Sequence, residues 1–479
     1  MSKGFDMENK LNEAKPKRQI NLPARASLWY IISGILGKAC GVIATPFFTR
    51  ILTDEEYGEL TLYMTVLGGA SVICSAFSTG SAVYKGMQKY RAESESFAGS
   101  VLAASLLFSS LICTLLLTLS RFLGLRSRLL LPLTLQILCD TVMGVFYSID
   151  RFRYRYREVC TLSVISYVLP PALAILIWNR IGKRFGVRIY SLLAVSAASS
   201  VYALYKILRS RKKARPEMMK YLSKQALPLL PHSISSALSS QTDKLIITYL
   251  LGAGALAKYS VANSIGISLM FLVTTLGGAF NPWIIRRLGQ GENRKIASLF
   301  TPLYSILAAA ALFPIAIAPE AMAILAPKEY SESLFAIVPI ALSALPSFII
   351  STATVGMVHA EKGKYTVILS LATAGGCILF NFMIIPILGY LGAGLSILLS
   401  QTIGAILAFY FLKQSGLSKM MDSVILAKVF LSTSLTGTVI SLLYPFPALR
   451  VLMLIFPAVR MLNSIFSAKH LIYEKSLLA

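Results

Sequence analysis

Residues 97–119 read FAGSVLAASLLFSSLICTLLLTL, without a charged side chain along the whole stretch. An α-helix rises about 1.5 Å per residue, so about 20 such residues cross a bilayer core about 30 Å thick. Working outward from this segment, we find fourteen mostly apolar stretches of similar length, in a chain that is 56% hydrophobic and 14% charged. The sequence therefore predicts an all-α, polytopic membrane protein with about 14 transmembrane helices.

The spacing of these stretches predicts two six-helix lobes followed by two extra helices. The N-lobe occupies residues 28–208, a basic linker 209–226, and the C-lobe 227–412; residues 1–27 form an N-terminal tail, and 413–479 hold the last two spans and a C-terminal tail. Transporters are often built from such repeats, with the substrate site near the bilayer midplane. The spans are expected near 28–49, 57–79, 97–119, 128–148, 160–178, 187–207, 227–250, 258–285, 299–318, 335–358, 365–386, 391–412, 424–444 and 448–466.

The net charge of +25, from 46 Lys and Arg against 21 Asp and Glu, does not indicate a nucleic-acid-binding protein, because the basic residues follow the topology. The two tails and the loops on their side of the membrane hold 33 of them, and the opposite loops hold 11. The positive-inside rule then predicts that both termini of this multi-pass protein lie in the cytoplasm. The run of alternating arginines at 151–157 is predicted to rest on anionic membrane lipid.

Lys38 lies at the centre of the first predicted span, where an ionisable group costs about 2.5–3.5 kcal/mol on insertion scales. Gly34, Lys38, Gly41 and Thr45 recur at helical spacing and form one small, polar face. The functional hypothesis is a cation facing a water-filled cavity, with Thr45 beside it. The alternative is a lysine neutralised by a structural partner.

The seventh predicted span, LPLLPHSISSALSSQTDKLIITYLLG, is too polar to face lipid along its whole length. Ser240 and Lys244 share one stripe of this helix, and Asp243 lies beside it. These residues either line a cavity as substrate or ion ligands or pair with neighbouring helices. Asp140, near the centre of the fourth span, is a candidate counter-ion of Lys38 or part of a proton or cation site.

Other polar and sulfur-containing features indicate structural roles. Thr53 and Glu56 have the spacing of a capping box that begins the second helix. The six cysteines lie in or at the ends of spans, show no CxxC spacing, and are interpreted as small packing residues. We therefore expect no metal site and no cofactor.

Three motifs resemble those of the polysaccharide and oligosaccharide flippases of the multidrug/oligosaccharidyl-lipid/polysaccharide (MOP) superfamily. They are TPFFTRILTDEEYGELTLY at 45–63, SSQTDKLIITYLLGAGALAKYSVANSI at 239–265 and NFMIIPILGYLGAGLSILLSQ at 381–401. The third contains the Asn–Pro–Gly–Gly–Ala pattern as Asn381, Pro386, Gly389, Gly392 and Ala393. The family more often has Arg where this chain has Lys244.

The resemblance implies a V-shaped, two-lobe transporter of the cytoplasmic membrane that carries an undecaprenyl-diphosphate-linked oligosaccharide from the inner to the outer leaflet by alternating access. Lys38 and Lys244, with Thr45 and Ser240, would bind the anionic head group. Asp243, Asn381 and Asp140 are candidates for coupling to Na+ or H+. The implied partners are the lipid-linked oligosaccharide, membrane lipids, a polysaccharide polymerase and glycosyltransferases, and no nucleic acid.

Two rival functions stay open at this point. An ion-coupled multidrug exporter of the same superfamily would favour acidic cavity groups, and Asp140 and Asp243 keep that alternative alive. A membrane enzyme of polysaccharide assembly would need a sizeable external loop with catalytic groups. The longest candidate loop, residues 319–334, has only about sixteen residues, so we expect a transporter rather than an enzyme.

Overall fold

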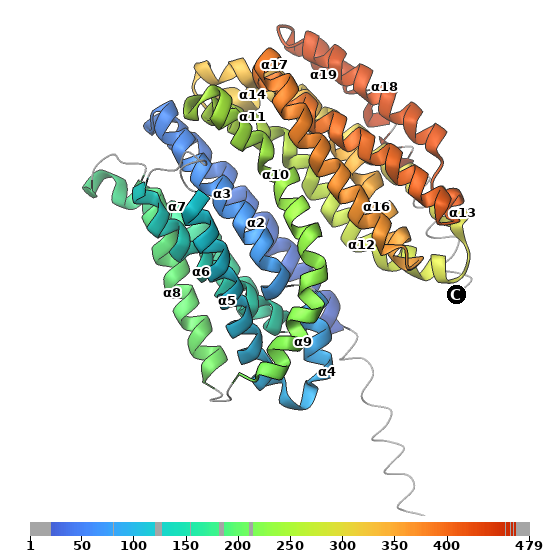
Figure 1. Ribbon diagram of the computed structural model, residues 1–479. Coiled ribbons are helices and arrows are strands. Elements are labelled where there is room, and N and C mark those ends of the chain that lie inside the picture. Colours follow the sequence, from blue (N-terminus) through green and yellow to red (C-terminus); the bar gives the residue numbers. More distant parts are fainter. Residues whose placement is uncertain are drawn as a thin grey trace, which may run out of the picture. The chain divides into compact units, whose positions relative to one another are not determined.

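The computed structural model describes residues 21–79, 81–119, 127–153, 155–181, 186–209, 214–455, 457–459, 461–462 and 464–465. Within these ranges the side chains of residues 21–28, 31, 38, 81, 179–181, 279 and 282 lie outside the described part. All regular elements in the described ranges are helices, as Figure 1 shows. The predicted all-α class is therefore confirmed.

Eleven helical stretches of the described residues are long and apolar enough to cross a membrane, so the chain is a multi-pass membrane protein. One stretch, Gly363–Gln414, contains two of the fourteen predicted spans. The seventh predicted span corresponds to the helix Leu230–Leu251, whose serines lower its hydropathy, and the last to the short helical stretch Pro447–Val459. These three differences explain why the structure has eleven candidate spans among its described residues and the sequence predicts fourteen.

Packing divides the chain into two compact units. Unit 1 consists of Met1–Phe47 and Ala70–Leu230, and unit 2 of Phe48–Gly69 and Pro231–Ala479. Helices α2 (Asn21–Ile51) and α3 (Asp54–Ser78) each contribute residues to both units. The chain also passes from unit 1 to unit 2 between Leu230 and Pro231. This point follows shortly after the predicted basic linker, part of which, Pro216–Ala226, forms the helix α9.

Unit 1 is built around a core in which large side chains fill the space left by small ones. Phe97 and Phe146 are fully buried with Leu222 of α9. A Cβ at Gly86 would lie 1.9 Å from the Phe97 ring, so only glycine fits there. Such small residues allow helix backbones to approach closely in membrane bundles. The helices of this unit are α4 (Ser81–Lys89), α5 (Ser94–Leu119), α6 (Ser127–Phe152), α7 (Tyr156–Ile181), α8 (Gly186–Leu208) and α9.

Unit 2 has a larger core centred on α13, α16 and α17. The rings of Phe300 and Phe348 stack with centroids 5.0 Å apart, and Tyr304, Leu307 and Met357 are fully buried around them. The helices are α10 (Leu230–Leu251), α11 (Ala253–Gly266), α12 (Met270–Gly289), α13 (Asn293–Ala316), α14 (Ala318–Leu325), α15 (Ile337–Leu342), α16 (Ala344–His359), α17 (Gly363–Gln414), α18 (Ser423–Leu442) and α19 (Pro447–Met453).

The Asn–Pro–Gly–Gly–Ala pattern marks a sharp break inside α17. Gly389 has φ 53° and ψ −127°, a conformation that only glycine adopts readily. A Cβ at Gly392 would lie 2.6 Å from the carbonyl oxygen of Ile384, so the second glycine allows the chain to pass close to its own preceding turn. The break separates the predicted eleventh and twelfth spans, at 365–386 and 391–412, as the sequence indicates.

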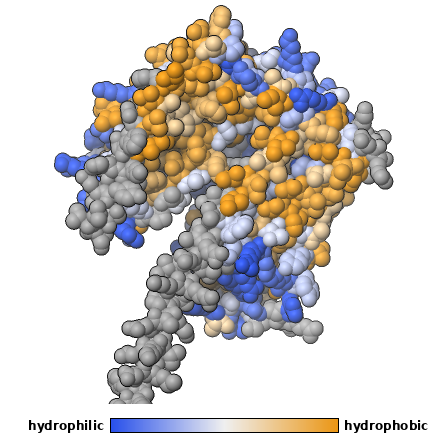
Figure 2. All heavy atoms as spheres, turned by 180° about the vertical axis from the view of Figure 1, so that it is seen from behind, coloured by the Kyte–Doolittle hydropathy of each residue, from blue (hydrophilic) through white to orange (hydrophobic). Residues whose placement is uncertain are grey.

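The outer surface is apolar and many buried side chains are polar, as expected for helices that face lipid. Ile387 and Ile43 are 79% and 74% exposed, whereas Ser100 and Ser396 are fully buried. Buried hydroxyls form hydrogen bonds to backbone carbonyls one helical turn earlier; the Ser100 hydroxyl, for example, donates to the carbonyl of Ser96 at 2.8 Å. Figure 2 shows broad hydrophobic areas on the face in view, with hydrophilic residues gathered in smaller patches.

Two polar contacts fix helix ends in unit 2. The backbone N–H of Thr53 donates to the Glu56 carboxylate (3.2 Å), and that of Glu56 donates to the Thr53 hydroxyl (3.3 Å), which confirms the predicted capping box. Arg450 of α19 is almost fully buried and donates to both carboxylate oxygens of Glu320 (2.6 and 3.0 Å) and to the carbonyl of Ala316 (2.7 Å). The arginine in the last predicted span therefore fastens α19 to the α13–α14 junction.

Candidate functional site

The most buried acid among the predicted site residues, Asp243, is held by a tyrosine that follows it sixteen positions later. The Tyr259 hydroxyl donates to Oδ2 of Asp243 at 2.6 Å, and both side chains are 3% exposed or less. Gly252, with φ 89°, ends α10 and allows α11 to begin at once, which brings Tyr259 back beside Asp243. A charge-assisted hydrogen bond of this length stabilises a carboxylate away from water.

Asn381 and Cys377 of α17 complete this buried cluster in unit 2. The amide of Asn381 donates to Sγ of Cys377 at 3.3 Å, and Asp243 lies near enough to interact electrostatically with the Cys377 thiol. Oδ1 of Asn381 is buried without a donor among the described residues. Carboxylate, amide and phenol oxygens are the ligands that hard cations prefer, and a carboxylate is also a proton site. The cluster thus has the chemistry of a cation or proton site.

Lys244 does not form an ion pair with its neighbour Asp243 among the described residues. Lys244 is half-buried, and its ammonium group donates to Oε1 of Gln241 at 3.3 Å. Gln241 in turn donates to the hydroxyl of Ser240 at 3.4 Å. A mutual Asp243–Lys244 ion pair is therefore not formed, whereas Asp243 does contact a neighbouring helix through Tyr259 of α11. Among the described residues the ammonium group of Lys244 is thus in contact with the neutral amide of Gln241.

Asp140 lies in a separate polar cluster within unit 1. Nε2 of Gln136, one turn earlier on α6, donates to Asp140 at 2.8 Å and to Ser196 of α8 at 2.8 Å, and the Ser71 hydroxyl of α3 is 3.5 Å from the other carboxylate oxygen. Oε1 of Gln136 is buried without a partner among the described residues. Three helices thus converge on one acid in the interior of this unit.

The predicted residues of the first span are only partly visible. The Lys38 backbone lies in α2, and its side chain, for which the sequence predicts either a cavity cation or a partner of Asp140, lies outside the described part of the chain. The Thr45 hydroxyl donates to the carbonyl of Gly41 at 3.0 Å, a local helix contact. The structure therefore places Asp243 with Asn381 and Lys244 with Ser240 in unit 2, and Thr45 and Asp140 in unit 1.

Sequence reasoning missed three partners of the predicted residues. Tyr259 was visible only as part of a motif, Cys377 only as a packing cysteine, and Gln241 only as one of several polar residues in the seventh span. A position one helical turn from a predicted site residue is a usable signal for Gln241, three residues before Lys244, and for Cys377, four residues before Asn381. The Tyr259–Asp243 contact depends on the turn at Gly252, which spacing along one helix does not reveal.

A family model described as polysaccharide biosynthesis protein matches residues 24–287, more than half of the chain. The chain belongs to this family. It is also similar to the succinoglycan biosynthesis transport protein ExoT of Rhizobium meliloti, with 24% identity over 307 residues, 62% of this chain and 61% of that protein. The alignment therefore spans less than two thirds of this curated relative.

Solved structures of transporters share the fold. The lipid II flippase MurJ in an inward closed conformation superposes with a TM-score of 0.71 at 14% identity, over 92% of this chain and 98% of MurJ. An outward-facing multidrug resistance MATE transporter of the MOP superfamily superposes with a TM-score of 0.60 at 16% identity, over 83% of this chain and 97% of that chain. The predicted relationship to this superfamily is thus confirmed at the level of fold.

Proposed function

We propose that the protein is a flippase that moves an undecaprenyl-diphosphate-linked oligosaccharide from the inner to the outer leaflet of the cytoplasmic membrane by alternating access. The observation that carries the proposal is a half-buried lysine, Lys244, inside the helix α10 of a chain from the polysaccharide biosynthesis family. An intramembrane charge needs a functional or structural partner. Because Lys244 contacts the neutral Gln241 and forms no ion pair among the described residues, its charge can attract a diphosphate.

The same proposal assigns substrate binding to Lys38, Lys244, Thr45 and Ser240. A sugar diphosphate is anionic and strongly hydrated, so its carrier requires cations and hydroxyls in a wet cavity. The lipid tail can stay in the bilayer, so a large enclosed pocket is not required. Support for this assignment is the position of these residues on α2 and α10, the first helix of each predicted lobe.

We infer that Asp243, with Asn381, forms a Na+ or H+ coupling site. A bound ion biases two conformations only if its affinity differs between them. Asp243 meets the requirement of a responsive group, because among the described residues its carboxylate is held by the phenol of Tyr259 on another helix. Cys377, which interacts electrostatically with Asp243, accepts from Asn381, whose amide oxygen has no donor among the same residues. Asp140 is the corresponding candidate in unit 1.

An ion-coupled multidrug exporter is the second candidate function. It is favoured by the two interior acids, Asp140 and Asp243, because cationic drugs pair with acidic groups. The choice depends on which charge meets the cargo. Loss of the lysine charge disables a carrier of diphosphates, whereas loss of an acid disables a carrier of cations.

The test is a flipping assay in proteoliposomes with a fluorescent lipid-linked oligosaccharide and a membrane-impermeant quencher. Wild-type protein is expected to equilibrate the substrate between leaflets, Lys244→Gln to lose this activity, and Lys244→Arg to retain part of it, because the charge survives in a different geometry. Lys419→Gln, which removes an exposed lysine between α17 and α18, is the matched control. Normal flipping by Lys244→Gln, or export of cationic dyes without flipping, would overturn the proposal.

Topology is tested separately. We expect a single cysteine at Glu55 in a cysteine-free background to be labelled from outside the cell, and one at Glu217, which is exposed on α9, to be labelled only after permeabilisation. The motive is the asymmetry of 33 basic residues against 11. The reverse labelling pattern would contradict cytoplasmic termini.

A further inference from the structure

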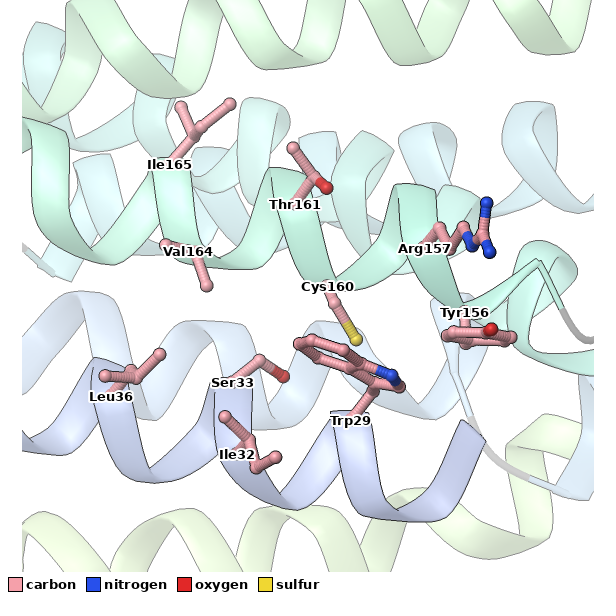
Figure 3. Close-up of a pocket in the computed structure, with 10 residues that line it drawn as sticks. All are labelled: Trp29, Ile32, Ser33, Leu36, Tyr156, Arg157, Cys160, Thr161, Val164 and Ile165. Atoms are coloured by element: carbon pink, nitrogen blue, oxygen red, sulfur yellow. The ribbon is translucent and has the colours of Figure 1, made fainter. Parts of the chain in front are cut away.

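Unit 1 contains a half-open cavity of about 590 Å3 between α2 and α7, and its described lining includes no residue of the proposed transport site (Figure 3). On α2 its wall consists of residues spaced three to four apart, from Trp29 through Ile32 to Leu36. On α7 the wall runs from Arg157 to Ile165. Such spacing places each set on one face of its helix. The two faces therefore line a groove along the helices.

The groove is polar at one end and apolar at the other. Figure 3 shows the Arg157 guanidinium, the Tyr156 hydroxyl and the indole nitrogen of Trp29 toward one end, and Leu36, Val164 and Ile165 toward the other. Eight residues separate Arg157 from Ile165, which is about 12 Å along a helix axis. One leaflet of the hydrocarbon core is about 15 Å deep. The groove thus has the depth of one leaflet and the polarity of one lipid molecule.

We propose that this groove is a binding site for a resident anionic phospholipid. One acyl chain lies between α2 and α7, and Arg157 binds the headgroup phosphate. Tryptophan and tyrosine prefer the level of the headgroups, where the ring is half in the apolar phase. Arginine is suited to phosphate because its planar group donates two parallel hydrogen bonds. The alternating arginines at 151–157 add an attraction for anionic headgroups over neutral ones.

The position of the groove favours a phospholipid over the transported substrate. On α2 the small polar face with Gly34, Gly41 and Thr45 lies on the opposite side of the helix from Trp29 and Leu36, by the rotation of 100° per residue. The groove is therefore separate from the face assigned to the substrate head group. A polyprenyl chain is also much longer than one leaflet is deep, so most of it would lie outside a 12 Å groove.

Trp29 supplies an intrinsic probe for the test. It is 48% exposed in the groove, whereas Trp178, in the same unit, is 2% exposed. Purified full-length protein is placed in vesicles that contain brominated phosphatidylglycerol or brominated phosphatidylcholine, and the quenching of tryptophan fluorescence is measured. The signal of Trp29 is the difference between wild type and Trp29→Phe. We expect brominated phosphatidylglycerol to quench this signal at a fraction about fivefold lower than brominated phosphatidylcholine, the preference of one basic side chain for an anionic surface.

Two variants separate the groove from the general surface charge. Arg157→Gln should abolish most of the preference for phosphatidylglycerol, and Arg155→Gln, the same charge loss outside the groove lining, should lower it only slightly. Val164→Phe, which narrows the apolar end, should weaken quenching by both lipids. Equal quenching by the two lipids in wild type, or an equal effect of the two arginine variants, would overturn the proposal. Displacement of the brominated lipid by a polyprenyl diphosphate at a low fraction would assign the groove to the substrate instead.

Discussion

Replacing Tyr259 by phenylalanine tests the proposed coupling site most sharply. The substitution keeps the ring and removes one hydroxyl, which donates to the Asp243 carboxylate at 2.6 Å in the interior of unit 2. A hydrogen bond to a charged group contributes about 1.5–3 kcal/mol. That stabilisation belongs mainly to the ion-free carboxylate, because a bound proton or cation competes with the phenol for the same charge.

Tyr259→Phe should therefore raise the affinity of Asp243 for its ion by about 10- to 150-fold, since about 1.4 kcal/mol corresponds to a factor of ten. In vesicles, the Na+ or H+ concentration that supports half-maximal flipping should fall by that factor. Maximal flipping should also slow, because the ion leaves the site less readily. The fraction of substrate flipped is measured while each gradient is varied in turn.

Tyr304→Phe is the control, because Tyr304 is equally buried in unit 2 and its hydroxyl has no partner among the described residues. It should leave the ion dependence unchanged, and its thermal stability should stay near that of wild type. If Tyr259→Phe shows the same half-maximal ion concentration as Tyr304→Phe, Asp243 is not the coupling group. A fall of the half-maximal concentration by the same factor for Na+ and for H+ would support Asp243 as the coupling group and would not distinguish between the two ions.

Three further outcomes follow from the structure. Asp243→Asn should remove gradient dependence from flipping while leaving substrate binding, measured with the fluorescent lipid, within a few-fold of wild type; unchanged gradient dependence would leave Asp243 a structural hydrogen-bond partner. Gly389→Ala should destabilise unit 2 by about 1–3 kcal/mol, because alanine is strained at φ 53°, and a thermal melt in detergent that matches wild type would refute this. The hydrogen bonds from Arg450 lower the pKa of Glu320, so the pair stabilises α19 at neutral pH, and this stabilisation is lost as the pH falls through the lowered pKa. At pH 7 the melting temperature of Glu320→Gln should be modestly lower than that of wild type, because Glu320 is half exposed. In acid the two melting temperatures should converge.

Much of the fold follows from the sequence because each span carries its own hydrophobic signal. The segment 97–119 and the two halves of α17 are recognisable without a partner, since bilayer thickness sets their length. The seventh span was harder, because Ser240, Asp243 and Lys244 bring its hydropathy below that of a typical span. Its polarity nevertheless identified it as a helix with interior contacts.

The partners of the site residues could not be predicted in the same way. Asp243 and Lys244 are adjacent in sequence but lie about 100° apart around α10, so each meets a different environment. Asp243 accepts a hydrogen bond from Tyr259, whose position depends on the chain reversal at Gly252. Lys244 donates to Gln241 on its own helix. The groove between α2 and α7 was invisible for a related reason. Its lining residues resemble any apolar helix face until the distance between the two helices is known.

The division of the chain into two units has a mechanical consequence. The chain passes from one unit to the other at three places, after Phe47 in α2, after Gly69 in α3 and after Leu230, the first residue of α10. Each is next to a weak point of the helical backbone: Pro46, the pair Gly68–Gly69, and Pro231. Proline removes a hydrogen bond from the helix and glycine lowers its stiffness. The helical backbone is therefore expected to bend more readily at these three positions than elsewhere along the same helices.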